Sequence, residues 1–537
     1  GSDISGAITN SGTITAGVNA FEIEETSDIS GAITNEAGGT ITAGGDAFYV
    51  SASTISGGIT NRGTITGGTN AINIVNATAP IAITNSGLLD GAVILDDSTL
   101  TLAGRAGRVT GAVSGGADST VTVRGTFATE NTFDVDNFAI GTRGRFTIGH
   151  GVTTTSGLSN AGTLAVAGGV DTTLTGDYTQ MTGGNLEFST GSGFGTIAVT
   201  GTADLTASGL VTVNEPGLLT AGTVQNVLTA TTLRAGRLTT TSSGNLFYAV
   251  TAVRDGNTID LEVERDVMAT DLVANTGPYA GVAQAVDNLL DAGGGNTDTN
   301  AVLSELSSLP TNEAAANAIA QLVPVLAGRG TIAATQAMDA TMGLVRHRTG
   351  ARKGGRRSGL GAGDDTRYER GALWLKPFGA YADQDTRSGT PGFEVDTVGI
   401  GLGGDIEVND RLLLGAAVAW SDTEVDGDTV SSNRLDAETY QLVFYGDYAL
   451  NETDFIESYA VTGWNDNETR RQISVGGLTR QARGDYSSFF TRIYTGLGRH
   501  YHTSDSWTFA PVVNLRYTYI DEDRYLEKGA GSLNLAV

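Results

Sequence analysis

The sequence predicts a mainly β protein with a right-handed parallel β-helix, a helical linker and part of a transmembrane antiparallel β-barrel. Three observations lead to this prediction. A motif repeats about every 25 residues near the N-terminus, apolar residues follow at helical spacing, and long alternating strands fill the last third of the chain. The composition agrees, since 76 glycines, 8 prolines and only 17% charged residues suit neither a disordered chain nor a helical bundle.

Charge and cysteine content exclude several classes of function. The chain has 59 acidic and 32 basic residues and a net charge of -27, so it lacks the attraction to phosphate backbones on which nucleic-acid binding depends. It contains no cysteine, which excludes disulfides and thiolate metal sites and suits a protein that crosses the oxidising periplasm.

The sequence shows neither a leader nor a helical membrane segment. Residues 1–4 lack the charged and apolar regions of a signal peptide, so we expect that a leader has been removed or that the sequence begins within a longer protein. No stretch reaches the roughly 18 uncharged apolar residues that a transmembrane helix needs. Any membrane segment must therefore be a β-barrel.

Internal repetition is the first structural signal along the chain. Residues 4–21 recur as residues 29–48 and 55–72, and a weaker copy begins near Ile81. A spacing of about 25 residues is typical of solenoids and propellers. Within each copy, short apolar alternations such as residues 13–15 are separated by glycine and asparagine, which indicates strand, turn and strand. We therefore expect each copy to form one coil of a parallel β-helix.

Equivalent positions of the copies should stack along the axis of the solenoid. Ile14, Ile41 and Ile65 are expected inside it. A row of asparagines is expected at a turn, where the amides can bond to one another along the axis. A calcium or sugar site is the alternative, but the acidic nonapeptide repeat of such sites is missing, so a structural ladder is favoured. The row consists of Asn10, Asn35, Asn61 and Asn85.

The repeat weakens after residue 158, while short strand patterns continue as far as residue 265. These patterns predict further coils that form a stem below the repetitive part. The clearest of them are residues 176–180, 183–188, 197–203 and 210–213.

Helical spacing replaces the strand patterns after Arg265. Apolar residues fall three or four positions apart over residues 282–290 and again over residues 302–309. Thr311 followed by Glu313 is typical of a helix start, because the hydroxyl can cap the first turn and the carboxylate complements the helix dipole.

The rest of the linker should contain one more helix and a flexible connector. Pro324 is expected to end the preceding helix, and a further helix is expected over residues 331–348. The basic, glycine-rich residues 352–363 then predict a solvated connector, which we favour over a patch for nucleic acid.

Long alternating strands begin at Gly371. In residues 411–421, the positions from Leu412 to Trp420 at every second residue face opposite to the intervening, mostly small residues. Residues 507–517 alternate more sharply, with aromatics at both ends of the apolar face. Strands of about ten residues with aromatic rims are typical of a bilayer-spanning barrel, whereas a soluble sandwich needs only five or six residues per strand.

Residues 371–537 closely resemble the autotransporter β-domain of type V secretion. The motifs that carry the resemblance are Leu373-Trp-Leu-Lys-Pro-Phe-Gly379, Gly389-Thr-Pro-Gly-Phe393, Val398-Gly-Ile-Gly-Leu-Gly-Gly-Asp405, Leu414-Gly-Ala-Ala-Val-Ala-Trp420 and Tyr440-Gln-Leu-Val-Phe-Tyr-Gly446. The strand patterns of residues 158–264 similarly resemble the membrane-proximal end of autotransporter passengers, which helps the remainder to fold.

The resemblance implies a closed barrel, an α-helix through its pore and a last strand that ends in an aromatic residue. We count about seven strands and the start of an eighth at residues 532–537, so the resemblance implies an incomplete barrel in this chain. The expected parts are a repetitive passenger (1–157), a stem (158–265), a helical linker with the pore helix (266–370) and the β-barrel domain (371–537).

A glycine pattern in the barrel region matches a nucleotide-binding motif by chance. Gly399, Gly401 and Gly404 fit the dinucleotide fingerprint, but the segment lies within a strand and no helix follows it. We expect these glycines to leave room for the pore helix at the barrel wall.

The sequence offers no convincing catalytic, cofactor-binding or metal-binding residues. His500 and His502 share a face of an expected strand, but no third ligand is evident. The other candidates are isolated histidines or acidic pairs in turns that solvated loops explain, namely His150, His347, Asp96 with Asp97, and Asp364 with Asp365.

The leading hypothesis for function is secretion without enzymatic activity. The resemblance implies an outer-membrane barrel that anchors and translocates its own passenger to the Gram-negative cell surface, with no cofactor. The expected partners are outer-membrane lipid, the barrel assembly machinery, periplasmic chaperones and a host or neighbouring-cell surface, but not nucleic acid. We expect an adhesin-like passenger, because extended strands offer area and not a pocket.

Two hydrolase hypotheses remain as alternatives. The solenoid and barrel could carry a protease or esterase domain that lies before the first residue. A β-helix enzyme that cleaves polysaccharides should show an acidic cluster at coil spacing, and none is visible. Some members of the family cut their own linker at an asparagine pair, and residues 312–348 contain no such pair, so cleavage is left open.

Overall fold

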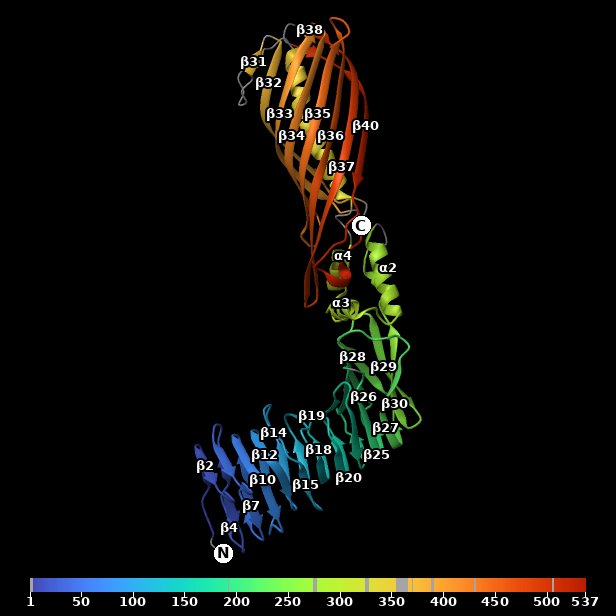
Figure 1. Ribbon diagram of the computed structural model, residues 1–537. Helices are drawn as coiled ribbons and strands as arrows, with labels where there is room; N and C mark the ends of the chain where they lie inside the picture. Colours follow the sequence, from blue (N-terminus) through green and yellow to red (C-terminus); the bar gives the residue numbers. More distant parts are fainter. Residues whose placement is uncertain are drawn as a thin grey trace. The chain divides into compact units, whose positions relative to one another are not determined.

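The computed structural model describes residues 3–191, 193–273, 278–323, 328–353, 366–368, 370–387, 391–428, 431–504 and 507–537 (Figure 1). The chain forms two compact units, Gly1–Val267 and Met268–Val537. Strands dominate both, so the predicted mainly β class is confirmed. Among the described residues, no helix has the length and apolar character that a membrane crossing would need.

The N-terminal unit is a parallel β-helix. Strands at equivalent places in successive coils pair in parallel and in register, so that Ile33 lies between Ile8 and Ile59. The same ladder continues coil by coil as far as Val224–Ala235. The ladder begins with β1 (Ile8–Asn10), β5 (Ile33–Asn35), β9 (Ile59–Asn61), β11 (Ala82–Asn85), β13 (Thr99–Leu102) and β16 (Thr120–Val123).

Further parallel ladders complete the repetitive coils. They place Ile41 between Ile14 and Ile65, as the repeat predicts, and Ile41 and Ile65 are fully buried while Ile14 in the first coil is half-buried. The strands are β2 (Thr13–Ala16), β3 (Phe21–Ile23), β4 (Asp28–Ile29), β6 (Thr40–Ala43), β7 (Phe48–Ser51), β8 (Thr54–Ile55), β10 (Thr64–Val75), β12 (Leu88–Leu95), β14 (Arg108–Val109) and β15 (Val113–Gly115).

The predicted asparagine row is a continuous hydrogen-bonded ladder. Each Nδ2 atom donates to the Oδ1 atom of the next asparagine, at 2.9 Å from Asn10 to Asn35, 2.9 Å from Asn35 to Asn61 and 2.8 Å from Asn61 to Asn85. The same Nδ2 atoms also donate to backbone carbonyls, such as that of Thr64 at 3.1 Å from Asn35. These buried amides therefore satisfy one another across coils, as a structural ladder requires.

The stem continues the coils and ends in an antiparallel hairpin. Strand β30 (Thr258–Arg265) pairs antiparallel with both β27 (Val224–Ala235) and β29 (Tyr248–Asp255). The preceding strands are β17 (Thr126–Ala128), β18 (Phe133–Ile140), β19 (Arg145–Ile148), β20 (Val152–Asn160), β21 (Thr163–Val166), β22 (Asp171–Thr175), β23 (Tyr178–Gln180), β24 (Asn185–Ser189), β25 (Thr196–Leu205), β26 (Leu210–Asn214) and β28 (Thr239–Ser243).

The second unit begins with the helices that the spacing predicts. Helix α4 (Asn312–Gln321) is capped by Thr311, whose hydroxyl accepts from the amide of Ala314 at 3.1 Å, and Glu313 lies in its first turn. Pro324 and the predicted connector from residue 354 onward lie outside the described residues. The other helices are α1 (Ala269–Leu272), α2 (Pro278–Asp291), α3 (Thr297–Ser307) and α5 (Arg329–Lys353).

The barrel sheet consists of antiparallel strands in chain order, as a barrel built from hairpins requires. Its long strands run between 11 and 22 residues, more than the expected ten. They are β32 (Gly371–Gln384), β33 (Phe393–Asn409), β34 (Leu412–Gly427), β35 (Asn433–Ala449), β36 (Asp454–Val475), β37 (Leu478–Arg499) and β40 (Val512–Glu522), and the short strand β31 (Thr366–Tyr368) precedes them.

Two predicted strands of the barrel region are wrong in detail. Residues 507–517 do not form one strand, because the ladder breaks before Val512, where Pro511 has no amide hydrogen to donate. Short strands β38 (Tyr501–Ser504) and β39 (Trp507–Phe509) pair with each other instead. Residues 532–537 do not begin a strand. They contain the 3-10 turn Gly531–Leu533 and fold back, so that Val537 bonds to Tyr525 in both directions at 3.0 and 3.1 Å.

Candidate functional site: the barrel wall and the helix in its lumen

The barrel wall presents two chemically different faces. Along β34, Leu414 and Val418 keep 46% and 53% of their surface exposed, whereas Leu413 and Ala417 keep only 7% and 4%. The exposure alternates because successive side chains of a strand point to opposite faces of the sheet. The alternation predicted for residues 411–421 is therefore confirmed, and the even positions of this strand face outward.

Strand β40 has the orientation that its sequence pattern predicts. Val513 and Leu515 are 81% and 78% exposed on the outer face. Arg516 lies 3.4 Å from the carboxylate of Asp339 on helix α5, so it points inward. Asn514 lies two residues before Arg516 on the same strand and therefore also points inward.

Helix α5 lies along the inner face of the sheet, as the resemblance implies for a pore helix. Its apolar side chains are spaced to share one helix face and are buried against wall residues from β32 to β37. The helix contributes Ala334, Met338, Met342 and Val345, and the wall contributes Trp374, Leu413, Ala417, Val443, Tyr445, Tyr459, Val461, Phe490 and Tyr494.

Polar contacts fix the position of α5 along the lumen. Arg492 of β37 is only 2% exposed and forms an ion pair with Asp339. The amide of Gln441 donates to the carbonyl of Ala337 at 3.2 Å and to the hydroxyl of Thr341 at 2.9 Å. A buried charge that loses its partner costs several kcal/mol, about 3 to 5 in measured cases, so a shifted helix would be strongly disfavoured.

The first residues of α5 are tied to one rim of the barrel. The guanidinium of Arg329 donates to the carbonyls of Gly392 at 3.1 Å and Asp426 at 3.4 Å. The hydroxyl of Thr331 donates to Glu522 of β40 at 3.0 Å. The ends of three strands therefore surround the point at which the chain enters the lumen.

The glycine pattern in β33 has two structural explanations. A Cβ atom on Gly401 would come within 2.9 Å of Leu344 of α5, so this glycine does leave room for the helix, as expected. Gly399 and Gly404 instead leave room for the ring of Phe378 and the side chain of Leu373 from the neighbouring strand, and for these two the expectation was wrong.

The structure places two of the candidate residues in ring and backbone contacts. His500 lies between β37 and β38, outside the single strand that was expected, and the centre of its ring lies 4.7 Å from that of Phe455. Asp96 accepts from the backbone of Ala77 at 3.2 Å, which is a turn contact. Within the described ranges, no group of three or more histidine, aspartate or glutamate side chains could hold a metal ion. Asp364 and Asp365 lie outside those ranges.

An unbroken row of aromatic residues crosses the outer face of four neighbouring strands. Trp420, Tyr440, Trp464 and Phe489 are direct partners across β34, β35, β36 and β37. All four are exposed, and the rings of Tyr440 and Trp464 stack at 5.6 Å. Aromatic residues on the outer face of a barrel mark the boundary between the hydrocarbon core and the polar headgroups.

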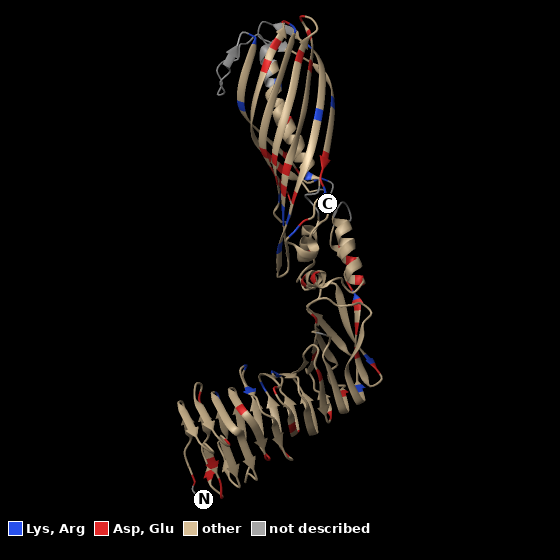
Figure 2. Ribbon diagram, in the orientation of Figure 1, with Lys and Arg blue, Asp and Glu red and all other residues tan. Residues whose placement is uncertain are grey.

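Charged residues follow directly beyond this aromatic row at the outward positions of the same strands. Figure 2 shows charged positions gathered toward one end of the barrel strands. Three successive rows of cross-strand partners carry them, and we name the three rows together the charged belt. The rows are Asp422, Glu438, Asp466 and Ser487, then Glu424, Asp436, Glu468 and Asp485, then Asp426, Arg434, Arg470 and Arg483.

The comparison with protein families fits this geometry. A model described as "Autotransporter beta-domain" matches residues 373–537. The chain is an outer-membrane autotransporter. The wall, the aromatic row and the helix in the lumen are thus parts of its β-domain, and the passenger is exposed at the cell surface.

Curated relatives share parts of the autotransporter. "Outer membrane protein A" of Rickettsia conorii is 30% identical over 197 residues, which cover 34% of this chain and 9% of that protein. "Outer membrane protein B" of Rickettsia prowazekii is 25% identical over 181 residues, 33% of this chain and 11% of that protein. "Extracellular serine protease" of Serratia marcescens is 23% identical over 341 residues, 58% of this chain and 32% of that protein. The matches thus span about a tenth of the Rickettsia proteins, and no solved structure gives a significant match.

The surface location of the passenger orients the β-domain in the membrane. The passenger precedes α5 in the chain, and α5 begins at the rim formed by Gly392, Asp426 and Glu522. That rim must therefore face the outside of the cell. The charged belt lies between the aromatic row and this outer rim.

Electrostatic contacts outside the membrane join the linker to the tip of the β36–β37 hairpin. Asp298 of α3 forms an ion pair with Arg480 at 2.6 Å and accepts from the amide of Ser532 at 2.6 Å. Both contacts hold the pKa of Asp298 below its usual range, with the hydrogen bond from Arg480 as the larger cause. Glu305 accepts from the amide of Gly477 at 2.7 Å at the turn itself.

The sequence analysis missed the residues that fix α5 and most of the aromatic row. Arg492 stands at an inward position of an outwardly apolar strand, and Asp339 interrupts an alanine-rich helix. Each is an isolated charged residue at a position where no charge is needed for solubility. Since a buried charge needs a partner, the sequence already indicated that each of them belongs to an ion pair. Tyr440, Trp464 and Phe489 become a row only when the strand register is known.

Proposed function

We propose that the β-domain translocates its own β-helical passenger across the outer membrane and then anchors it, and that the passenger is adhesin-like. The observation that supports translocation and anchoring is the position of α5. The helix is held against the inner face of the wall through the Asp339 pair with Arg492, and it is covalently continuous with the passenger through α1 to α4. A chain that enters a barrel from the outside in this way must have been threaded through it or assembled with it.

Folding of the passenger can bias its own export without nucleotide hydrolysis. Each coil bonds only to its neighbours, so coils add one by one to a folded end. The antiparallel hairpin β29–β30 closes the end of the β-helix that is nearest to the membrane in sequence. Folding that starts at this hairpin outside the cell would prevent the chain from sliding back.

We propose that this assembly depends on the barrel assembly machinery and periplasmic chaperones, and on outer-membrane lipid. A sheet that exposes Leu515 and Val513 to lipid cannot remain soluble in the periplasm by itself. Nucleic acid is not an expected partner, because the net charge is -27.

The proposal of an adhesin-like, non-enzymatic passenger rests on its surface. The ladders of the β-helix build long strand faces with rows of outward threonines, such as Thr34, Thr60 and Thr84. A regular face of this kind offers area and hydrogen bonds to a host or neighbouring-cell surface. Repeated side chains spread over such a face favour broad contact over the convergence of a nucleophile, a base and an oxyanion site that a hydrolase needs.

A second candidate function has one specific observation in its favour. The similarity to a protein named "Extracellular serine protease" extends over 58% of this chain, so solenoid and barrel could carry a hydrolase domain. In that case the described passenger would act as a spacer between the catalytic domain and the membrane.

Intact Gram-negative cells that express the protein test these proposals. Protease added outside should remove the passenger and leave the β-domain in the membrane, whereas a passenger protected until the cells are opened would contradict export. Cells that display the passenger should adhere to host cells or to one another more strongly than cells displaying the β-domain alone. A fluorophosphonate probe that labels the displayed chain would favour the hydrolase over the adhesin.

A further inference from the structure

We propose that the charged belt is a docking surface for the headgroups of lipopolysaccharide, with divalent cations as bridges. The proposal goes beyond export and display, because it concerns what holds the β-domain in the outer leaflet. It rests on the depth of the belt, on its fixed arginines and on the shape of the surface.

The depth of the belt follows from the strand register. Two residues along a strand advance about 6.7 Å, which becomes about 5 Å along the membrane normal at the tilt of a transmembrane barrel. The belt therefore lies within about 5 to 15 Å outside the aromatic row that begins with Trp420. This is the layer of phosphates and inner sugars in the outer leaflet, and not bulk water.

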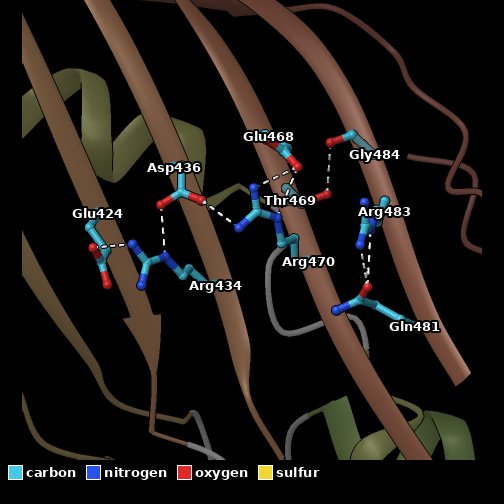
Figure 3. A network of polar contacts seen from close by, with 9 residues as sticks. All are labelled: Glu424, Arg434, Asp436, Glu468, Thr469, Arg470, Gln481, Arg483 and Gly484. Carbon is cyan, nitrogen blue, oxygen red and sulfur yellow. Dashed lines mark hydrogen bonds and ion pairs between the residues drawn. The ribbon is translucent and has the colours of Figure 1, made fainter. Parts of the chain in front are cut away.

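Two of the three arginines of the belt, Arg434 and Arg470, are held in place by shared carboxylates, and the third, Arg483, donates to the amide oxygen of Gln481 (Figure 3). Arg434 bonds to Glu424 and, at 2.8 Å, to Asp436, and Arg470 lies 3.6 Å from the other oxygen of Asp436 and 2.9 Å from Glu468. The side chains of Arg434 and Arg470 remain 40% and 42% exposed. An exposed guanidinium of fixed orientation can bind a phosphate or carboxylate with two hydrogen bonds and loses little entropy in doing so.

The belt is also hollowed. A depression of about 610 Å³ lies on this surface and is lined by Asp436, Asp466, Glu468, Arg470 and their neighbours. It is large enough for a phosphorylated sugar and sits on the same strands as the lipid-facing row. The docking surface is thus continuous with the membrane contact that the β-domain already makes.

Charge complementarity selects the occupant. Phospholipid headgroups with a single phosphate would meet an excess of carboxylates and be repelled. Lipopolysaccharide carries several phosphates and carboxylates on rigid sugars, which exist in the membrane cross-linked by Mg²⁺ or Ca²⁺, and such oxygen-rich ions bind carboxylates well. In this arrangement the arginines bind the anionic groups directly, and the carboxylates bind the bridging cations.

The test uses the full chain folded in detergent and purified lipopolysaccharide that contains lipid A and the inner-core sugars. Native mass spectrometry counts the bound glycolipid, and titration gives its affinity with Mg²⁺ or with EDTA. The variants are Arg434→Gln with Arg470→Gln, and Asp436→Asn with Glu468→Gln. The matched control is Arg499→Gln, since Arg499 also forms an exposed pair, with Asp454 at 2.5 Å, but at the opposite rim of the same hairpin.

Both double variants should weaken binding roughly tenfold or more, since each removes charged hydrogen bonds or cation ligands. The carboxylate variant should also lose most of the effect of Mg²⁺, while Arg499→Gln should bind like the parent protein. Equal binding by parent and arginine variant, or equal loss in the control, would overturn the proposal. So would equal binding of phosphatidylglycerol micelles, because the surface would then recognise negative charge alone.

Discussion

Glu215 should make the stability of the β-helical unit depend on pH. This residue follows β26 in the stem and is fully buried, with 0% of its surface exposed. One carboxylate oxygen accepts from the hydroxyl of Ser242, and no hydrogen-bond partner for the other is found in the described part of the chain. Burial raises the pKa of Glu215 from 4.5 to about 7, partly offset by the Ser242 hydrogen bond.

The sign and size of the effect follow from proton linkage. Because the pKa is higher in the folded stem than in the unfolded chain, the folded state binds the proton more tightly. The stabilisation is complete below pH 4.5 and is lost as the pH rises through about 7. A difference of this size between the two pKa values corresponds to about 3 kcal/mol. Most of it, about 2 to 3 kcal/mol, should disappear between pH 5 and pH 8.

Glu215→Gln isolates this contribution, because glutamine has nearly the same shape and cannot ionise. Urea unfolding of the passenger unit is followed by circular dichroism from pH 5 to pH 8 in both proteins. The difference between the two free energies should grow in favour of the variant by about 2 to 3 kcal/mol across this range, since all other groups cancel. A flat difference would show that Glu215 reaches water in the folded stem, and a difference of opposite sign would mean that a cation stabilises its charge.

Three further predictions concern the ladder, the wall and the helix. Asn61→Ala should lower the free energy of unfolding of the passenger by about 2 to 4 kcal/mol in urea titrations, because it leaves buried amides unpaired on both sides, while Thr60→Ala should have little effect. Leu515→Arg should reduce the heat-modifiable, inserted form far more than Asn514→Arg, since arginine at a lipid-facing midplane position costs roughly 2 to 4 kcal/mol. Similar losses for both would mean that the strand does not lie in a membrane barrel, and a larger loss for Asn514→Arg would mean that its faces are reversed. Gly401→Leu should displace α5 and lower the temperature at which the folded band is lost, and an unchanged temperature would contradict the close packing of helix and wall.

The passenger was the most predictable part of the fold. Its repeat places identical residues at identical points of each coil, so the stacking of Ile41 on Ile65 and of Asn35 on Asn61 follows from spacing alone. The helix that Thr311 caps was equally readable, because a cap is a local interaction. Handedness and the antiparallel end of the stem have no such local signature.

In the barrel, the sequence predicted which side chains face outward and which face inward, but it did not predict the strand register or the structure of the rim. Alternation in β34 and β40 gave the correct outer and inner sides, because parity depends only on the strand itself. The turn at Gly531 depends on a contact between distant segments, that of Asp298 with Ser532, whereas the break before Val512 has a local cause in Pro511 that the alternation concealed. The pair of Asp339 with Arg492 is 153 residues apart in sequence and could be guessed only as two unexplained charges.

The sequence of a single strand of this β-domain places its side chains in three environments, namely the lumen, the hydrocarbon core and the headgroup layer. Steps of one and of two residues along the strand lead from one environment to another. From Trp420, a step of one residue leads to Ser421, which faces inward and is fully buried, so the side of the wall changes. A step of two residues leads to Asp422, which stays on the outer face but lies one row further from the hydrocarbon core. Whether a residue stands at an odd or an even position of the strand therefore decides whether its side chain faces the lumen or the membrane. How far along the strand it stands decides whether an outward side chain meets the lipid chains or the headgroups. Because neighbouring strands repeat the change from aromatic to acidic at paired positions, the boundary is a property of the sheet. A substitution that moved a single strand by one residue would exchange the lumen and membrane faces of that strand.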